Sequence, residues 1–169
     1  VGRTMTLANV AFLSALNGLR VLVMDWDLEA PGLAYYFRCL VDSAQAKELT
    51  EQPGVLDILW DWSESAKNVK SDEEFEALLT DCKTGAAFER CTYGLYADDA
   101  SDGVLHFVGA GSRHLDSCDL SYEEALAQFA WPAFFEDRVG GIMLQELRRW
   151  AKANYCLLYT SPSPRDQEA

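Results

Sequence analysis

Two apolar segments near the beginning of the chain have the lengths and patterns of a helix and a buried strand. From Thr4 to Leu16 there is no proline, glycine or charged residue, and the spacing predicts a helix that is apolar on both faces. We therefore expect this helix to be buried. Asn17-Gly18 predicts its end. The run RVLVMD, from Arg20 to Asp25, then has the continuous apolar character of a strand inside a parallel sheet.

The rest of the pattern predicts further helices and a second buried strand. Helices are expected at about 54–62, 71–83, 121–131 and 141–154, the second and third opened by the capping boxes Ser71-x-x-Glu and Ser121-x-x-Glu. Trp131-Pro132 ends or kinks the third. The run VLHFVGAG (104–111) predicts a strand leading into a glycine-rich turn, and 91–96 suits either a strand or an irregular loop. Helices that alternate with apolar strands predict an α/β protein with a doubly wound, mostly parallel sheet and flanking helices.

Composition and charge argue for a single globular domain and against several classes of partner. The chain has 169 residues, of which 49% are hydrophobic, so it can bury the core of one domain. Its formal net charge is −13, and so acidic a surface repels nucleic acid and anionic membranes. The five cysteines show no Cys-x-x-Cys spacing, which argues against zinc and for reduced thiols in the cytoplasm. No uncharged run is long enough to span a bilayer.

The first residues match the end of a phosphate-binding loop. Such a loop needs glycine so that backbone N–H groups can approach phosphate oxygens, a cation for their charge, and a hydroxyl for magnesium. It leads into a helix whose N-terminal dipole favours the anion. Gly2, Arg3 and Thr4 supply these groups in order, in front of the predicted helix. The same three residues also suit an ordinary helix start.

Two carboxylates follow the first predicted strand. Asp25 and Asp27 lie at its carboxyl end, where ligands bind in open α/β sheets. Separated by one residue, they suit a magnesium shell and a hydrolytic water. Asp25 alone is equally compatible with a residue that caps a turn. The pair, placed after a loop, a helix and a strand, favours a functional site.

Residues 1–33, VGRTMTLANVAFLSALNGLRVLVMDWDLEAPGL, resemble the ParA/MinD-type ATPases with a deviant Walker A motif, and specifically their bacterial KGGVGR-motif variant. In that group the loop reads K-G-G-V-G-R-T, with arginine in place of the usual lysine, and the next strand ends in D-x-D-L-E-A-P-G-L. Weaker similarity continues through LHFVGAGSR (105–113) and up to the helix that ends in WAKANY (150–155). The resemblance implies a P-loop NTPase fold of the SIMIBI type.

The resemblance also implies ATP and Mg²⁺ as cofactors. Gly2, Arg3, Thr4 and Met5 would then bind the nucleotide. Gly2 would present its backbone to the phosphates, and the Arg3 guanidinium would lie on the β- and γ-phosphates as a planar fork. Thr4 would also coordinate the metal through its hydroxyl.

The resemblance assigns different tasks to the two aspartates. Asp25 would hold a magnesium-bound water, as a metal-site residue together with Thr4. Asp27 would be catalytic, together with Arg3, by orienting or polarising the attacking water. Residues 29–32 would form a mobile switch segment.

Two parts of the family's pattern are not found where the resemblance predicts them. The lysine and first two glycines of the loop, with the first strand, would precede Val1, and the Walker B strand would begin at about Tyr155. Instead, CLLYTSPSPRD (156–166) is identical to a translation of a transposase-type sequencing adapter. We interpret 1–155 as a partial, incomplete P-loop ATPase domain and 156–169 as a non-native tail. We expect YCLLYTS to imitate the missing strand and this chain by itself to be inactive.

These features lead to one main hypothesis and two alternatives for the parent protein. The main hypothesis is a cytoplasmic, magnesium-dependent nucleotide switch ATPase, which binds ATP across a homodimer as similar ATPases do. The first alternative is a nucleotide-bound interaction module with little hydrolysis, which acts through a protein partner or an appended effector domain. The second is a DNA-partition ATPase, and the acidic charge counts against nucleic acid as its partner.

Overall fold

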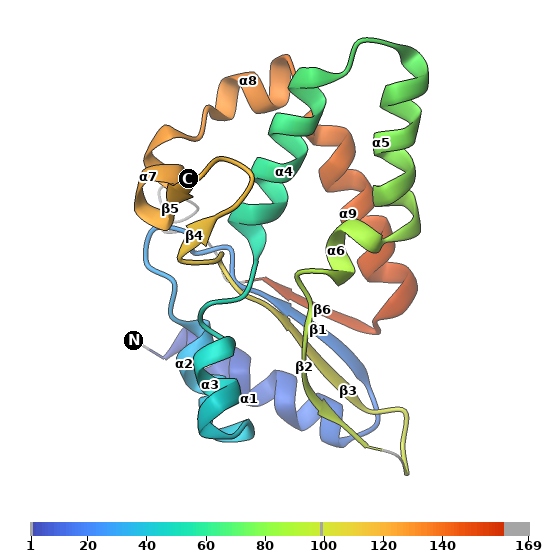
Figure 1. The fold of residues 1–169 in the computed structure, drawn as a ribbon. Helices are drawn as coiled ribbons and strands as arrows, with labels where there is room; N and C mark the ends of the chain where they lie inside the picture. Colours follow the sequence, from blue (N-terminus) through green and yellow to red (C-terminus); the bar gives the residue numbers. More distant parts are fainter. Residues whose placement is uncertain (1, 99, 161–169) are drawn as a thin grey trace.

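The computed structural model describes residues 2–98 and 100–160, and it shows a mixed α/β protein built on a four-stranded sheet (Figure 1). The strands are β1 (Arg20–Met24), β2 (Tyr93–Ala97), β3 (Val104–Val108) and β6 (Leu157–Thr160), and their order across the sheet is β2-β3-β1-β6. β1 pairs in parallel with β3 and with β6, whereas β2 pairs antiparallel with β3. The sheet is therefore mixed, with one antiparallel edge strand.

Helices cover both faces of this sheet (Figure 1). One face carries α1 (Arg3–Leu16), α2 (Leu33–Phe37), the short 3-10 helix η1 (Arg38–Leu40) and α3 (Ser43–Glu48). The other face carries α4 (Val55–Asn68), α5 (Asp72–Thr84), α6 (Ala86–Glu89) and α9 (Gly140–Asn154). The second layer extends beyond the end of the sheet through β4 (His114–Leu115), β5 (Leu120–Ser121), α7 (Tyr122–Gln128) and α8 (Trp131–Glu136).

The strands send their side chains into two separate cores. In β1, Val21 and Val23 are buried in the layer that contains α1 and α2, whereas Leu22 and Met24 are buried in the layer that contains α4 and α9. Successive side chains on a strand point to opposite faces, so a sheet covered on both faces requires a continuous apolar run. The apolar strand predicted at 20–25 has this character and is found at 20–24.

The first helix is less buried than its apolar composition predicts. Ala8, Ala11 and Ala15 of α1 are buried, whereas Leu13 is 56% exposed and Leu16 46% exposed. The small alanine side chains let the helix lie close to the sheet, and the opposite face stays open. The prediction of a buried helix is therefore wrong for its outer face. None of the described helices, α1 included, has the length and apolar character needed to span a membrane.

Other predicted elements are found with changed boundaries. α4 begins at Val55 and continues past 54–62 as far as Asn68. The segment 91–96, whose pattern allowed two structures, contains the beginning of β2. Pro132 lies in the first turn of α8, where its missing N–H costs no helical hydrogen bond, so it begins a new helix.

Both predicted serine caps open helices. Ser121 Oγ accepts a hydrogen bond from the Glu124 N–H at 3.4 Å, and the Glu124 carboxylate accepts one from the Ser121 N–H at 3.1 Å, which completes a capping box. Ser71 Oγ likewise accepts the Glu74 N–H at 3.2 Å. The Glu74 carboxylate, however, accepts the N–H of Lys70 at 2.7 Å, one residue earlier than a reciprocal box requires.

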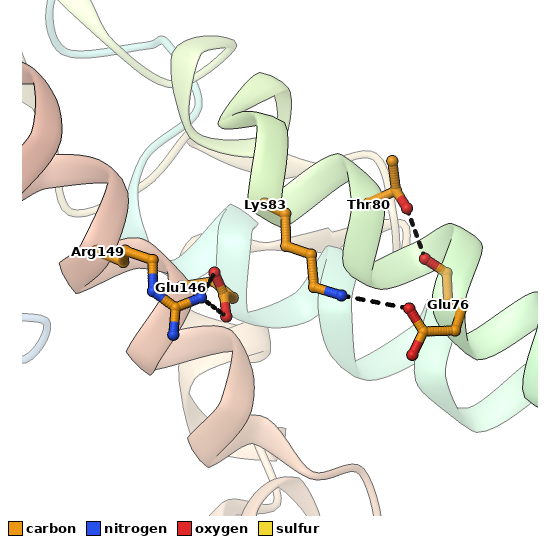
Figure 2. Close-up of polar contacts among 5 residues, drawn as sticks. All are labelled: Glu76, Thr80, Lys83, Glu146 and Arg149. Carbon is orange, nitrogen blue, oxygen red and sulfur yellow. Dashed lines mark hydrogen bonds and ion pairs between the residues drawn. The ribbon is translucent and has the colours of Figure 1, made fainter.

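Polar pairs of two kinds lie on the neighbouring helices α5 and α9 (Figure 2). Glu146 of α9 is buried, and its carboxylate accepts hydrogen bonds from Arg149 Nη1 at 2.5 and 2.7 Å. Lys83 and Glu76 of α5 form an exposed ion pair at 3.2 Å. The first pair stabilises a charge inside the second layer, and the other lies on its surface.

β6 extends the sheet on the side of β1 that faces away from β3. The Cys156 N–H donates to the Arg20 carbonyl at 2.8 Å, and residues 21–24 pair in parallel with 157–160. The strand expected within YCLLYTS is therefore present. The interpretation of 156–169 as a non-native tail stays a prediction, and 161–169 lie outside the described residues, as does Val1.

Candidate functional site

The predicted metal-site residues and the predicted catalytic aspartate meet at one cavity. Thr4, Asp25 and Asp27 all line it, and its volume is about 370 Å³. α1 carries Thr4 in its first turn, and the two aspartates follow the carboxyl end of β1. The remaining lining residues lie within 30–36, in the turn before α2 and in α2 itself. Folding thus brings a hydroxyl and two carboxylates together across about twenty residues of sequence.

The beginning of α1 presents backbone donors beside this cavity. Gly2, the residue before the helix, has φ +123°, in the region that favours glycine, and no described side chain caps the helix. Its first turn holds no acidic residue of its own, and the positive end of the helix dipole lies at this end. An anion next to Thr4 would be attracted by these N–H groups and by the dipole.

The other predicted nucleotide contacts lie outside the cavity lining. Gly2, Arg3 and Met5 are not among its lining residues, and both Arg3 and Met5 are exposed. Successive residues of a helix point about 100° apart, so the neighbours of Thr4 face in other directions. Contacts of Arg3 and Met5 with a nucleotide therefore stay predictions.

Asp25 is buried and is the hydrogen-bond acceptor around which the next segment folds. Its Oδ1 accepts the Asp27 N–H at 3.2 Å, and its Oδ2 accepts the N–H groups of Gly32 at 3.3 Å and Leu33 at 3.1 Å. These bonds close residues 25–33 into a loop and satisfy donors at the beginning of α2. Asp25 is thus a turn-capping residue and a lining residue of the cavity at once.

The surroundings of Asp27 favour the protonated form of its carboxyl group. Burial raises the pKa of its carboxyl group, and the charges of Asp25 and Glu29 raise it further against the lowering effect of a hydrogen bond. That bond comes from the Ala30 N–H, which Asp27 Oδ1 accepts at 3.3 Å. A carboxylate with a raised pKa accepts a proton from water more readily than an ordinary one.

Tyr122 contacts the loop 25–33, and no pattern in the sequence indicates this contact. Its hydroxyl donates to the Leu28 carbonyl at 2.9 Å and ties α7 to the loop 25–33, although the two residues are 94 positions apart. The only sequence signal near Tyr122 is the preceding cap Ser121, which specifies a helix start and no distant partner. Tyr122 is therefore a positioning residue for the loop that carries Asp27.

The oxygen donors at the cavity fit magnesium. Mg²⁺ is held by one or two carboxylates, by phosphate oxygens and by several waters. Both oxygens of Asp25 already accept N–H groups, so this carboxylate suits a bond to a metal-bound water better than direct ligation. Among the described residues there is no group of three or more His, Cys, Asp or Glu that could hold a metal ion. A cation here would therefore be held by Thr4, by oxygens that the ligand brings and, through a bound water, by Asp25.

Comparisons of the chain with protein-family models, with curated proteins and with solved structures find no match. The candidate site is therefore defined by the residues that line the cavity and by their hydrogen bonds.

Proposed function

We propose that the protein to which this chain belongs is an ATP-binding, magnesium-dependent switch ATPase of the ParA/MinD-like class, with a doubly wound P-loop fold. The observation that carries the proposal is the cavity that Thr4, Asp25 and Asp27 share at the beginning of α1. A hydroxyl and two carboxylates beside a helix N-terminus suit a phosphate group with its cation. The parallel pairing of β1 with β3, and helices on both faces of the sheet, support the doubly wound fold.

Each residue has a task in this proposal that follows from its position. The N–H groups at the beginning of α1 bind phosphate oxygens, and Thr4 with Asp25 holds the hydrated cation. Magnesium, when bound, would neutralise charge on the phosphates. Asp27 orients a water molecule and accepts its proton. Arg3 lies exposed at the first helical position, from which its flexible side chain turns to the phosphates.

The hydrogen bonds around the loop 25–33 support a switch. Asp25 holds this loop closed through the Gly32 and Leu33 N–H groups, and Tyr122 holds it through Leu28. A hydrated cation would compete for the same Asp25 oxygens. Binding at the cavity would therefore change the balance of bonds that fixes the loop, which is how a ligand shifts one conformation toward another.

The proposal predicts magnesium-dependent ATP binding that requires Thr4 and Asp25. In the protein expressed from the complete reading frame of its source DNA, Thr4→Ala and Asp25→Asn should each weaken ATP binding by about tenfold or more, because each removes a charge-assisted contact. Isothermal titration calorimetry with Mg²⁺ and with EDTA measures the effect. Thr6→Ala is the matched control, since Thr6 is an exposed threonine of the same helix that does not line the cavity. If the wild-type protein does not bind ATP in the presence of Mg²⁺, the proposal is wrong.

A second candidate function is a nucleotide-bound interaction module with little hydrolysis. The observation that favours it is the exposed Arg3, which stands outside the cavity instead of beside the two aspartates. Turnover separates the two functions, because a switch ATPase releases inorganic phosphate from ATP and the module does not. Tight binding without phosphate release would support the module.

A further inference from the structure

A second cavity adjoins the candidate site and is not used by the proposed chemistry. Its volume is about 540 Å³, and it shares Asp25, Gly32 and Tyr35 with the first cavity. Small-molecule sites in proteins measure roughly 300–1,000 Å³, so this one can hold a metabolite-sized ligand. Its walls come from α2 and η1, from residues 49–52, and from the segment 107–113 that ends β3. In Figure 1 these segments gather at the end of the sheet where β1 and β3 finish.

Two arginines line this cavity in a strongly acidic protein. The chain carries 14 Lys and Arg against 27 Asp and Glu, yet Arg38 and Arg113 both face the same cavity. The Arg38 guanidinium lies over the Tyr35 ring, 4.2 Å from its centroid, and this stacking holds it in place. Arg113 is 3.5 Å from Glu51 in an exposed ion pair. Exposed pairs of this kind contribute at most about 1 kcal/mol, so an incoming anion can compete for Arg113.

The wall opposite α2 is fixed before any ligand arrives. Asp57 is buried and accepts the Ser112 N–H at 2.8 Å and the Gly54 N–H at 2.8 Å. A Cβ at Gly111 would come within 2.9 Å of the Tyr122 ring, so glycine lets this loop pack closely. A preformed wall avoids the entropy of ordering a loop on binding.

The remaining lining residues indicate which chemical groups the ligand has besides its anionic group. Pro31, Ala34 and Tyr35 supply the accessible apolar surface. The carboxylates of Asp25 and Glu123 disfavour a second anionic group on the ligand. Gln52 also lines the cavity, and its side-chain nitrogen is buried with no hydrogen-bond partner among the described residues. A buried donor without an acceptor costs roughly 1–3 kcal/mol, which a ligand acceptor would recover.

We propose that this cavity binds a small organic anion with a single phosphate or carboxylate group. Arg38 and Arg113 hold the anionic group, and the apolar part of the ligand lies toward Ala34 and Tyr35. The anion would then be a co-ligand that touches the same Asp25–Gly32 wall as the nucleotide. The contact of the anion with a neighbouring nucleotide rests on the proposed function, whereas the binding of the anion itself does not.

The test uses three probes on the 169-residue chain. Phenyl phosphate and benzoate present the two anionic groups on one apolar ring, and inorganic phosphate presents the charge alone. Calorimetric titration should show saturable binding of at least one aromatic anion, tighter than that of inorganic phosphate. Arg38→Ala and Arg113→Ala should each weaken this binding by about tenfold, since each removes a hydrogen bond to a charged group. Whichever aromatic anion binds more tightly identifies the anionic group.

Matched variants make the result decisive. Arg148→Ala removes an exposed arginine of α9, away from this cavity, and should leave the affinity unchanged. Arg38 and Arg113 are exposed, so their removal should not unfold the chain, and thermal melting of each variant checks this. The proposal is overturned if neither aromatic anion saturates, or if both arginine variants bind as the wild type does. Anion binding by this chain that depends on both arginines, together with no ATP binding by the protein from the complete reading frame, would refute the proposed function and leave this site standing.

Discussion

Asp25 and Asp27 have different surroundings although only one residue separates them. Asp25 is 2% exposed and its oxygens accept N–H groups from the loop that it closes. Asp27 is less buried, and burial with the charges of Asp25 and Glu29 raises the pKa of its carboxyl group. Two carboxylates in unlike environments can take different tasks in one site. In the proposed function, Asp25 would hold groups in place and Asp27 would exchange a proton.

Replacement of Asp27 tests this division at the residue scale. If Asp27 accepts a proton from water, Asp27→Ala should lower ATP hydrolysis by about 10²-fold or more while ATP binding persists. The raised pKa fixes the pH dependence. Wild-type turnover should fall as the pH drops through that pKa, which lies above the ordinary value of 3.8, because the protonated carboxyl group cannot accept another proton.

Initial rates of phosphate release between pH 4 and pH 8 measure both effects in the protein from the complete reading frame. Asp102→Ala, in the exposed turn before β3, is the control for the loss of one acidic side chain. Unchanged turnover in Asp27→Ala would show that Asp27 does not have this task.

At the scale of elements, α9 carries a buried charged side chain, Glu146, whereas the ion pair of α5, Glu76 with Lys83, is exposed. The Glu146 side chain is 8% exposed, whereas the side chains of Glu76 and Lys83 are 67% and 47% exposed. Solvent screens an exposed pair, so losing one partner costs little. A buried carboxylate that loses its donor remains desolvated and unpaired, so that loss is expensive.

Two single substitutions compare these pairs (Figure 2). Arg149→Ala should lower the free energy of unfolding by about 1–3 kcal/mol, because Glu146 loses the donor of two hydrogen bonds. Lys83→Ala should change it by less than about 1 kcal/mol. Urea unfolding followed by circular dichroism gives both values. Adding Glu146→Gln to Arg149→Ala should restore part of the loss, and equal effects of the two single variants would contradict this account.

At the scale of the whole molecule, the reactivity of the cysteine thiols depends on whether the protein core is closed to solvent. Cys82 and Cys91 are buried in the layer of α4 and α9, and burial raises the pKa of Cys82 to about 11 and that of Cys91 to about 12. Cys39 and Cys156 are exposed. Reaction with a disulfide reagent needs both access and the thiolate, so burial and a raised pKa suppress it together.

Thiol labelling of the 169-residue chain therefore tests the fold as a unit. At pH 8, Cys39 and Cys156 should react with a chromogenic disulfide reagent within seconds, and Cys82 and Cys91 only after denaturant is added. Mass spectrometry of the labelled peptides identifies each site. Rapid labelling of Cys82 and Cys91 without denaturant would contradict the closed core described here.

The sequence by itself determined features that depend on neighbouring residues. The apolar run at 20–24 specifies a strand covered on both faces, and Ser71 and Ser121 specify helix starts, because a cap acts within three residues. The placement of Asp25 and Asp27 after that strand also follows from local order. The sequence did not decide the secondary structure of segment 91–96, because its short pattern suits a strand and a loop equally.

Only the tertiary structure decided which distant groups meet. It placed Thr4 in the lining of the cavity that Asp25 and Asp27 also line and left the exposed Arg3 outside that lining, since the helix period and the packing of α1 on the sheet fix which residues reach it. It left the outer face of α1 open, which apolar composition cannot reveal, because exposure depends on what packs against a helix. It also joined Tyr122 to Leu28 across 94 residues. Such contacts arise from the assembly of two layers on one sheet, and no local pattern carries their geometry.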